Sequence, residues 1–343
     1  MYAEITCSYV PLEIFSAAGL VPRRLLPPPA RETGLLPSNF CSYARACLFS
    51  RGDAPVVFTS CCDALRRCFD VRKAAGDAVF ILDLPRQTSG AGILRYRDEL
   101  KKMARWLQSL GAASPFSEEK LIEAIQIYRR IRAKLTALKE LSGRAESTYR
   151  TLLEVFSVSP EKALLSLGEM VRDAGKKNPG GKGTLPKGVL VAGTILPDPE
   201  VFFFFEESGA SVIYADFCLE ERLFLDAAPR RSLPGPERTE ETGTFLSDPW
   251  LFLAREYLEK PPCPRMVGKN SRRRFIESIL ESIRPAGVVF YGLKFCDHGL
   301  YDVPLWRNLC TKKGIPFLHL EGEYRGGVPA QLGTRIQAFL ETL

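Results

Sequence analysis

The sequence predicts an α/β protein with two doubly wound parallel-sheet domains and a helical segment between them. Two observations lead to this prediction. Short apolar runs typical of buried parallel strands occur in the first and the last part of the 343-residue chain, and helical patterns lie between those runs. Alternating strands and helices form parallel sheets with right-handed crossovers, which is a Rossmann-like architecture. A Gly- and Lys-rich stretch separates the two parts, so we expect one domain on each side of it.

The N-terminal part contains two runs that are typical of buried strands. They are "PVVFTS" at 55–60 and "AVFILDLP" at 78–85, and both are rich in β-branched or aromatic residues. The preceding stretch "EITCSYVPLEIFSAAG", at 4–19, is interpreted as a loop that enters a helix.

The pattern becomes helical from about residue 93 to residue 175. The stretches "ILRYRDELKKMARWLQSLG" and "SEEKLIEAIQIYRRIRAKLTALKELSG" have apolar residues three and four positions apart, and each ends at a glycine. The following residues, "GKKNPGGKGTLPKG", are basic and poor in apolar side chains. We therefore predict an N-terminal domain at 1–175, a linker at 176–187 and a C-terminal domain at 188–343.

Strands and helices alternate again after the linker. The predicted strands are "GVLVAG", "SVIYAD", "GVVFYG" and "PFLHLE", and "QLGTRIQAFLETL" is a closing helix. The stretch "APRRSLPGPERTEETG", at 228–243, is interpreted as an exposed loop.

Composition excludes some classes of function. No apolar run approaches the roughly 20 residues of a membrane span, and the N-terminus lacks the pattern of a secretory signal, so we expect a cytoplasmic protein. The net charge is +7, but the basic residues are scattered without a nucleic-acid motif, so we expect no nucleic-acid partner. A run such as Arg272, Arg273 and Arg274 is interpreted as a solvated helix face. Ten cysteines in a reducing compartment indicate metal ligands or catalytic thiols rather than disulfides.

Several cysteines follow predicted strands. Cys61 and Cys62 come after "VVFTS", Cys218 after "SVIYADF" and Cys296 after "GVVFYGLKF". Binding sites of doubly wound sheets form at the carboxyl ends of strands. Cys7 and Cys41 precede helical patterns, where the helix dipole favours a thiolate.

The other cysteines divide into two groups. Cys47, Cys68 and Cys310 lie inside helical patterns and are interpreted as packing residues, whereas Cys263 lies on a loop. Zinc is disfavoured because Cys-x2-Cys pairs are missing and the chain has only two histidines. Single cysteines from separate loops suit an iron–sulfur cluster, although their spacing alone leaves core packing open.

Eight stretches of the chain resemble the 2-hydroxyacyl-CoA dehydratase family, which includes benzoyl-CoA reductase subunits and double-cubane cluster proteins. They occur in family order and are "TCSYVPLEIFSAAG", "NFCSYA", "SCCDALRR", "FILDLPR", "EEKLIEAIQIYRRIR", "KFCDHGLYDVPLW", "GIPFLHLEGEY" and "QLGTRIQAFLETL". The resemblance covers almost the whole chain.

The resemblance implies a 4Fe–4S cluster bound by three cysteines, which match Cys41, Cys62 and Cys296. It also implies an anaerobic lyase: an ATP-dependent activator donates one electron, the thioester becomes a ketyl radical, and water leaves a 2-hydroxyacyl-CoA substrate. The implied assembly is a homodimer, or a heterodimer with a related subunit. His298 and Glu321 follow the last two predicted strands and are candidates for proton transfer, whereas His319 is interpreted as a core histidine with satisfied hydrogen bonds.

Two alternatives remain at this point. Cys7, Cys218 and Cys263 also match family positions, and six thiols suffice for a double-cubane 8Fe–9S cluster that reduces small molecules at low potential. A non-catalytic partner subunit, in which the thiols only pack, is the other alternative.

Overall fold

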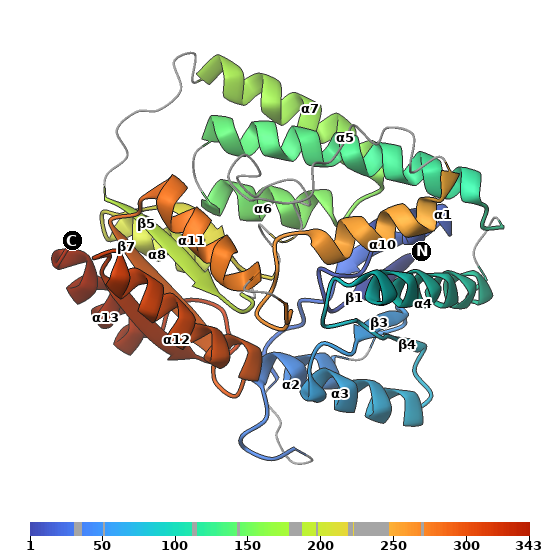
Figure 1. Cartoon of the computed structure of the whole chain (residues 1–343), viewed down its shortest axis with the longest axis horizontal. Coiled ribbons are helices and arrows are strands. Elements are labelled where there is room, and N and C mark those ends of the chain that lie inside the picture. Colours follow the sequence, from blue (N-terminus) through green and yellow to red (C-terminus); the bar gives the residue numbers. More distant parts are fainter. Residues whose placement is uncertain are drawn as a thin grey trace.

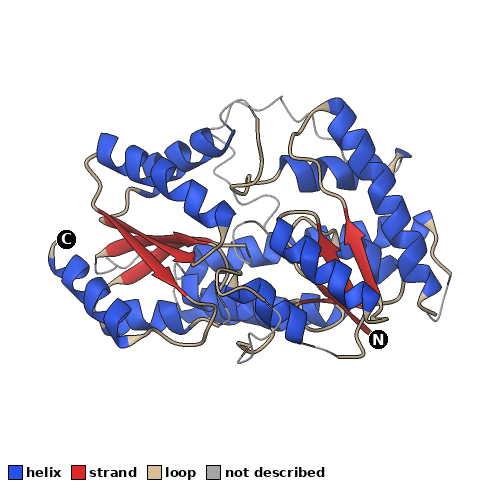
Figure 2. Ribbon diagram, turned by 90° about the horizontal axis from the view of Figure 1, so that it is seen from below, coloured by secondary structure: helices blue, strands red, loops and turns tan. Residues whose placement is uncertain are grey.

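The computed structural model describes residues 1–30, 36–50, 52–111, 115–142, 145–177, 187–196, 198–218, 222, 247–268 and 271–343. Within them the chain forms two four-stranded sheets, each entirely parallel and covered by helices. Figures 1 and 2 show the two sheets side by side, one built from each half of the sequence. The predicted α/β class with two parallel sheets is confirmed.

The two sheets have the same strand order. The first comprises β1 (Tyr2–Ile5), β2 (Val21–Arg24), β3 (Val56–Thr59) and β4 (Val79–Leu82), in the order β2-β1-β3-β4. The second comprises β5 (Gly188–Gly193), β6 (Ser211–Asp216), β7 (Gly287–Leu293) and β8 (Phe317–Gly322), in the order β6-β5-β7-β8. Each sheet therefore changes winding direction between its first and third strand, where doubly wound folds place their ligand sites.

Helices cover both sheets and bridge them. The helices of the first half are α1 (Leu12–Ala17), α2 (Ser42–Phe49), α3 (Asp63–Ala74), α4 (Gly90–Ser109), α5 (Glu118–Ser142), α6 (Ala145–Val155) and α7 (Pro160–Lys177). Those of the second half are α8 (Glu200–Glu207), α10 (Pro249–Glu259), α11 (Ser271–Ile283), α12 (Asp297–Lys312) and α13 (Ala330–Glu341). Helices α5, α6 and α7 pack on one another as a separate layer, which confirms the helical segment (Figure 1).

Two strands differ from the sequence prediction. Residues 2–5 form β1, although the start of the chain reads as a loop, and residues 21–24 form β2, which the sequence does not predict. Both strands have four residues, and β2 contains Pro22 and two arginines. Proline is tolerated there because β2 is an edge strand that pairs with β1 alone. Short strands with few β-branched residues give no clear periodic signal.

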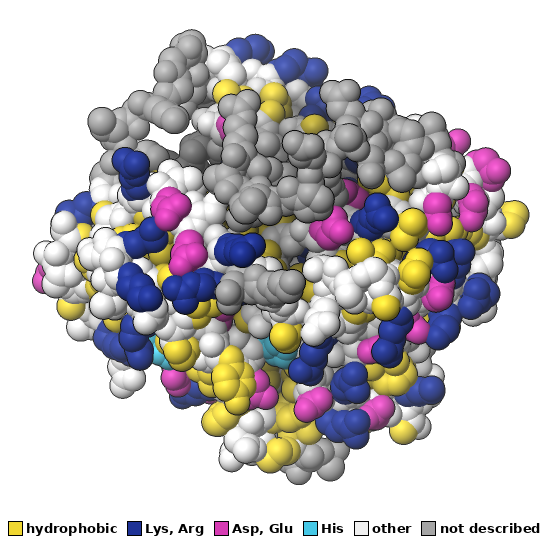
Figure 3. Space-filling model, in the orientation of Figure 1, with side chains coloured by type: hydrophobic (Ala, Val, Ile, Leu, Met, Phe, Trp, Pro, Cys, Tyr) yellow, Lys and Arg dark blue, Asp and Glu magenta, His cyan; other side chains and the backbone are white. Residues whose placement is uncertain are grey.

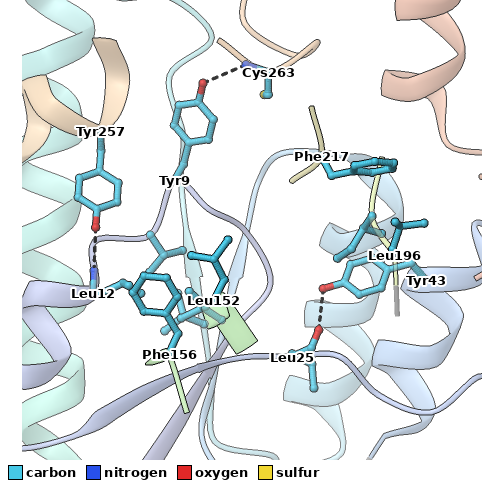
Figure 4. Close-up of a cluster of buried hydrophobic side chains, with 14 of the residues drawn as sticks. Tyr9, Leu12, Leu25, Tyr43, Leu152, Phe156, Leu196, Phe217, Tyr257 and Cys263 are labelled. Carbon is cyan, nitrogen blue, oxygen red and sulfur yellow. Dashed lines mark hydrogen bonds between the residues drawn. The ribbon is translucent and has the colours of Figure 1, made fainter. Parts of the chain in front are cut away.

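Helix α10 belongs to the second half of the sequence but packs against α4 and α5 of the first half. Figure 4 shows the Tyr257 hydroxyl of α10 accepting a hydrogen bond from the Leu12 backbone N–H at 3.1 Å. The same hydroxyl donates to the carboxylate of Glu13 at 2.8 Å, and Arg132 of α5 binds that carboxylate at 2.6 Å. The predicted boundary at 176–187 stays a prediction, because 178–186 lie outside the described residues.

Lys and Arg side chains are spread among acidic ones on the face shown in Figure 3, rather than gathered in one patch. No helix in the described part of the chain combines the length and apolarity that a membrane crossing needs. The predicted loop at 228–243 lies outside the described residues.

Candidate functional site: a cavity lined by cysteines

One cavity of about 100 Å³ between the two halves collects seven of the ten cysteines. The thiols that line it are Cys7, Cys41, Cys61, Cys62, Cys218, Cys263 and Cys296. Four come from the first half of the chain and three from the second. The cavity thus brings together all six cysteines that the sequence singles out as possible ligands, together with Cys61. Cys47, Cys68 and Cys310 do not line it and are fully buried, as the packing interpretation predicts.

Three of the cavity cysteines occupy the same structural position. Cys41, Cys62 and Cys296 are the N-cap residues of α2, α3 and α12. The Cys62 sulfur accepts a hydrogen bond from the Leu65 N–H at 3.4 Å. Unpaired N–H groups and the helix dipole both favour negative charge at such a position. The N-termini of these three helices therefore all contribute a positive potential to the same cavity, and this potential favours thiolates there.

The thiols of Cys41 and Cys296 hydrogen-bond to each other across the two halves of the chain. Donation from Cys296 lowers the pKa of Cys41 to about 7, and backbone N–H groups of α2 support the same shift. Donation raises the pKa of Cys296 well above its usual value, and burial adds to this effect. The pair therefore holds one readily lost proton, and loss of that proton leaves a thiolate in the cavity.

Cys61 hydrogen-bonds to both Cys7 and Cys62. The hydrogen bond to Cys62 is the main cause of the raised pKa of Cys61, and the hydrogen bond to Cys61 is the main cause of the raised pKa of Cys7. Side chains of adjacent residues diverge on an extended segment. Residues 60 and 61 instead form a turn between β3 and α3, so both Cys61 and Cys62 reach the cavity.

The remaining two thiols lie on loops of the second half. Cys218 follows β6, and its N–H donates to the Thr194 carbonyl at 2.9 Å. The Cys263 N–H donates to the hydroxyl of Tyr9 at 3.2 Å, which ties this loop to the first half (Figure 4). Burial raises the pKa of the Cys263 thiol.

A buried charge network supports the loop that carries Cys218. Asp216, at the end of β6, binds Arg222 at 3.1 Å and Arg272 at 2.6 Å, and Arg272 also binds Asp302 of α12. Burial would raise the pKa of Asp216, but the two guanidinium charges hold it below its usual value. Arg222 in turn donates to the Cys218 sulfur at 3.4 Å.

The same network corrects the interpretation of the basic run in α11. Arg272 is only 6% exposed and is held by two carboxylates, so it is not part of a solvated basic face. The sequence does not predict this, because β6, α11 and α12 are far apart in the chain.

The charged side chains that line the cavity are Arg24, Arg222 and Arg265, and no carboxylate lines it among the described residues. Arg265 donates to the carbonyls of Leu84 and Pro85. Sequence reasoning missed all three arginines. Arg24 ends the strand β2, which was not predicted, so its place at a strand terminus gave no signal.

The two candidates for proton transfer have different positions. His298 lies in the first turn of α12 and lines the cavity, and burial together with the charge of Arg265 lowers its pKa. Glu321 is exposed on β8 and does not line the cavity.

His319 differs from its sequence interpretation. Its Nε2 atom is buried without a hydrogen bond, and the nearest carboxylate oxygen, from Glu321, lies 4.0 Å away. It is therefore not a core histidine with satisfied hydrogen bonds.

The donor set of the cavity suits some metal groups and not others. In the described part of the chain, no three His, Cys, Asp or Glu side chains surround a point where a single metal ion would be held. An iron–sulfur cluster poses a different requirement, because each cysteine thiolate binds a separate iron. Several thiols around one cavity, helix N-termini and a cationic lining suit such an anionic cluster better than one zinc ion.

Comparison with known proteins gives two findings. The sequence profile described as 2-hydroxyglutaryl-CoA dehydratase, D-component, matches residues 7–343. A stretch of 158 residues is 25% identical to the (R)-phenyllactyl-CoA dehydratase beta subunit of Clostridium sporogenes. That stretch covers 46% of this chain and 38% of the relative, so it spans less than half of either protein. The near-complete profile match is decisive: the chain belongs to the 2-hydroxyglutaryl-CoA dehydratase D-component family.

Proposed function

We propose that this chain is the iron–sulfur subunit of a 2-hydroxyacyl-CoA dehydratase-type enzyme, with a 4Fe–4S cluster held by Cys41, Cys62 and Cys296. The observation that supports this most directly is the convergence of these three N-cap cysteines on one cavity. When bound, the cluster supplies one-electron transfer and a Lewis-acid site for the loss of water from a 2-hydroxyacyl-CoA by way of a ketyl radical.

The residues of the chain itself have three tasks in this proposal. Helices α2, α3 and α12 hold the thiolates and favour their charge. Leu65, Ile195 and Leu293 line the cavity with apolar surface and limit its hydration. His298 has a lowered pKa, so it is neutral at pH 7 and is able to accept a proton at the cavity.

A second candidate is a double-cubane 8Fe–9S reductase of small molecules. One observation favours it: Cys7, Cys218 and Cys263 line the same cavity as the first three cysteines. The six thiols divide equally between the two halves of the chain, with three contributed by each half.

Iron and sulfide quantitation on anaerobically purified protein distinguishes these candidates. We expect about four irons per chain for the single cubane and about eight for the double cubane. Protein that contains no iron, even after anaerobic reconstitution with iron and sulfide, would contradict both and favour a non-catalytic partner subunit.

We further propose that activity requires other proteins: an ATP-dependent activator, and a second copy or a related subunit. No Gly-x4-Gly-Lys-Ser/Thr phosphate loop occurs in the sequence, whereas the proposed one-electron reduction depends on ATP. The relative from Clostridium sporogenes is itself named a subunit. Turnover of a 2-hydroxyacyl-CoA by the purified chain with only ATP and a mild reductant would contradict this proposal.

A further inference from the structure

Thr194 has a buried hydroxyl without a partner at the cysteine-lined cavity. The residue directly follows β5, lines the cavity and is only 6% exposed. Its Oγ1 atom is buried and has no hydrogen-bond partner among the described residues. The backbone of the same residue is engaged, because the Thr194 carbonyl accepts a hydrogen bond from the Cys218 N–H at 2.9 Å. Burial of an unpaired hydroxyl is unfavourable, so the position of this group needs an explanation.

The first sheet contains a threonine at the equivalent position. Thr6 follows β1 as Thr194 follows β5, and β1 and β5 occupy the same place in two sheets of identical strand order. Thr6 also lines the cavity and is 2% exposed. Its hydroxyl, however, donates to the Val57 carbonyl of the neighbouring strand at 3.3 Å. The protein itself therefore satisfies the threonine of the first half, whereas it leaves the threonine of the second half without a partner.

Close packing places the Thr194 side chain next to the Cys296 sulfur. A β-carbon on Gly299 would overlap the Thr194 Cγ2 atom and would lie 3.7 Å from the Cys296 sulfur. The Thr194 methyl group thus occupies space that the absent side chain of Gly299 leaves free. Threonine is branched at its β-carbon, so a methyl group held in this way also fixes the direction of the hydroxyl.

The Cys296 sulfur becomes a better hydrogen-bond acceptor when it binds iron. Cysteine is a ligand in its thiolate form, which carries negative charge and has no proton to donate. A hydroxyl that donates to a charged acceptor forms a stronger hydrogen bond than one that donates to a neutral acceptor. Hydrogen bonds to the sulfurs of an iron–sulfur cluster also influence its reduction potential.

We propose that Thr194 is a positioning residue whose hydroxyl donates a hydrogen bond to the Cys296 thiolate when Cys296 binds the cluster. This rests on the proposed function and needs no ligand beyond Cys41, Cys62 and Cys296. The hydroxyl lacks a partner in the iron-free protein and gains one when the cavity is loaded. Thr194 therefore raises the midpoint potential of the cluster without binding iron itself.

The test compares Thr194→Val, Thr194→Ser and Thr6→Val with the wild type, both without iron and after anaerobic reconstitution. Valine keeps the branched shape and the methyl contact but removes the hydroxyl, whereas serine keeps the hydroxyl. Thr6→Val is a matched control, because it makes the same chemical change at the equivalent position of the first sheet, where the hydroxyl already donates to a protein carbonyl.

The two valine variants should behave in opposite ways. Without iron, Thr194→Val should melt at the same temperature as the wild type or higher, because it removes a hydroxyl that has no partner, whereas Thr6→Val should melt lower. After reconstitution, Thr194→Val should hold as much iron as the wild type. Its midpoint potential in an EPR-monitored titration should be more negative, because a donated hydrogen bond favours the more negatively charged reduced cluster. Thr194→Ser and Thr6→Val should keep a midpoint potential close to that of the wild type.

The possible failures are distinguishable. If the wild type takes up no iron, the proposed function fails, and the role of Thr194 fails with it. If the wild type loads iron but Thr194→Val keeps the wild-type midpoint potential, or shifts it no more than Thr6→Val does, the role of Thr194 is wrong while the proposed function stands. A lower melting temperature of iron-free Thr194→Val would show that the hydroxyl already has a partner in the empty protein, and loss of iron from this variant would show a role in ligation. Both results contradict the proposal.

Discussion

Cys61 and Cys62 are neighbours that both reach the cavity, yet their local roles differ. Cys62 caps α3, whereas the Cys61 thiol hydrogen-bonds to the thiols of Cys7 and Cys62. We predict that Cys62→Ser loses most of the iron and the brown absorbance, because a hydroxyl is a poor ligand for iron–sulfur clusters. Cys61→Ser should retain the iron and cost about 1 kcal/mol of stability. Anaerobic iron counts and absorbance spectra of the two variants test this.

The serine substitution separates ligation from folding. Serine is a preferred N-cap residue, so Cys62→Ser keeps α3 capped, and a loss of iron cannot be attributed to a broken helix. We expect Cys41→Ser and Cys296→Ser to behave like Cys62→Ser. Full iron retention in Cys62→Ser, or complete loss in Cys61→Ser, would show that the other thiol of the pair is the ligand.

A buried packing thiol makes stability depend on pH. Burial raises the pKa of Cys47 to about 12, whereas the unfolded thiol ionises near 8.5. The stabilisation from the neutral thiol is therefore complete below about pH 8.5 and decreases as the pH rises towards 12. We predict that the advantage of the wild type over Cys47→Ala in iron-free protein shrinks by about 2 kcal/mol between pH 8 and pH 10.

Urea unfolding at the two pH values measures this difference. Leu48→Ala is a matched control, because the neighbouring side chain is also buried but does not titrate. Its destabilisation should be the same at both pH values. An unchanged Cys47→Ala difference would mean that the buried thiol ionises as readily as an unfolded one.

At the scale of elements, the start of α12 is packed closely enough to position Cys296. A β-carbon on Gly299 would overlap the Cγ2 atom of Thr194, which follows β5, and would lie 3.7 Å from the Cys296 sulfur. We predict that Gly299→Ala moves the first turn of α12 outward, destabilises the protein by about 1–3 kcal/mol and reduces the iron content.

Gly90 provides the control for this substitution. It also lies in the first turn of a helix, α4, but a β-carbon there meets nothing within 4 Å. Gly90→Ala should leave iron content unchanged and stability the same or slightly higher. Equal iron content in the two variants would show that close packing at Gly299 does not position the thiol.

The elements also show what the sequence could predict. Strands β3 to β8 are apolar runs, so the sequence located them and placed Cys62, Cys218 and Cys296 near strand ends. Strands β1 and β2 were missed because β1 contains Glu4 and β2 contains Pro22 and two arginines, so neither is an apolar run, and Arg24 was missed with β2. The sequence predicted a helix start only for Cys41, because Cys62 and Cys296 lie between a strand and the helix that follows it, and a single sequence does not fix where such a short connection ends.

Contacts between distant segments could not be predicted. The burial of Arg272 depends on Asp216 and Asp302, which lie 56 and 30 residues away in the chain. The convergence of Cys7 and Cys263 depends on how the two sheets face each other. Single-sequence patterns carry no information on such docking, because the interactions are not periodic.

At the scale of the whole molecule, the predicted linker leads to a proteolysis experiment. The composition around Lys182 predicts the first cut there, whereas β7 is buried along its entire length and should resist. Because α10 packs on α4 and α5, the two fragments should still elute together in native gel filtration. Early cuts in β7, or fragments that separate without denaturant, would contradict this domain map.

The contribution of both halves to one cavity has a consequence for biosynthesis. A ribosome releases Cys7, Cys41, Cys61 and Cys62 long before Cys296 has been translated, so the nascent chain carries four thiols of an incomplete site. Air oxidation or capture of a stray metal at this stage competes with correct maturation. Under the proposed function, cluster delivery would have to wait until Cys296 and the last strands have emerged, and oxygen-free expression would matter during synthesis as well as during purification.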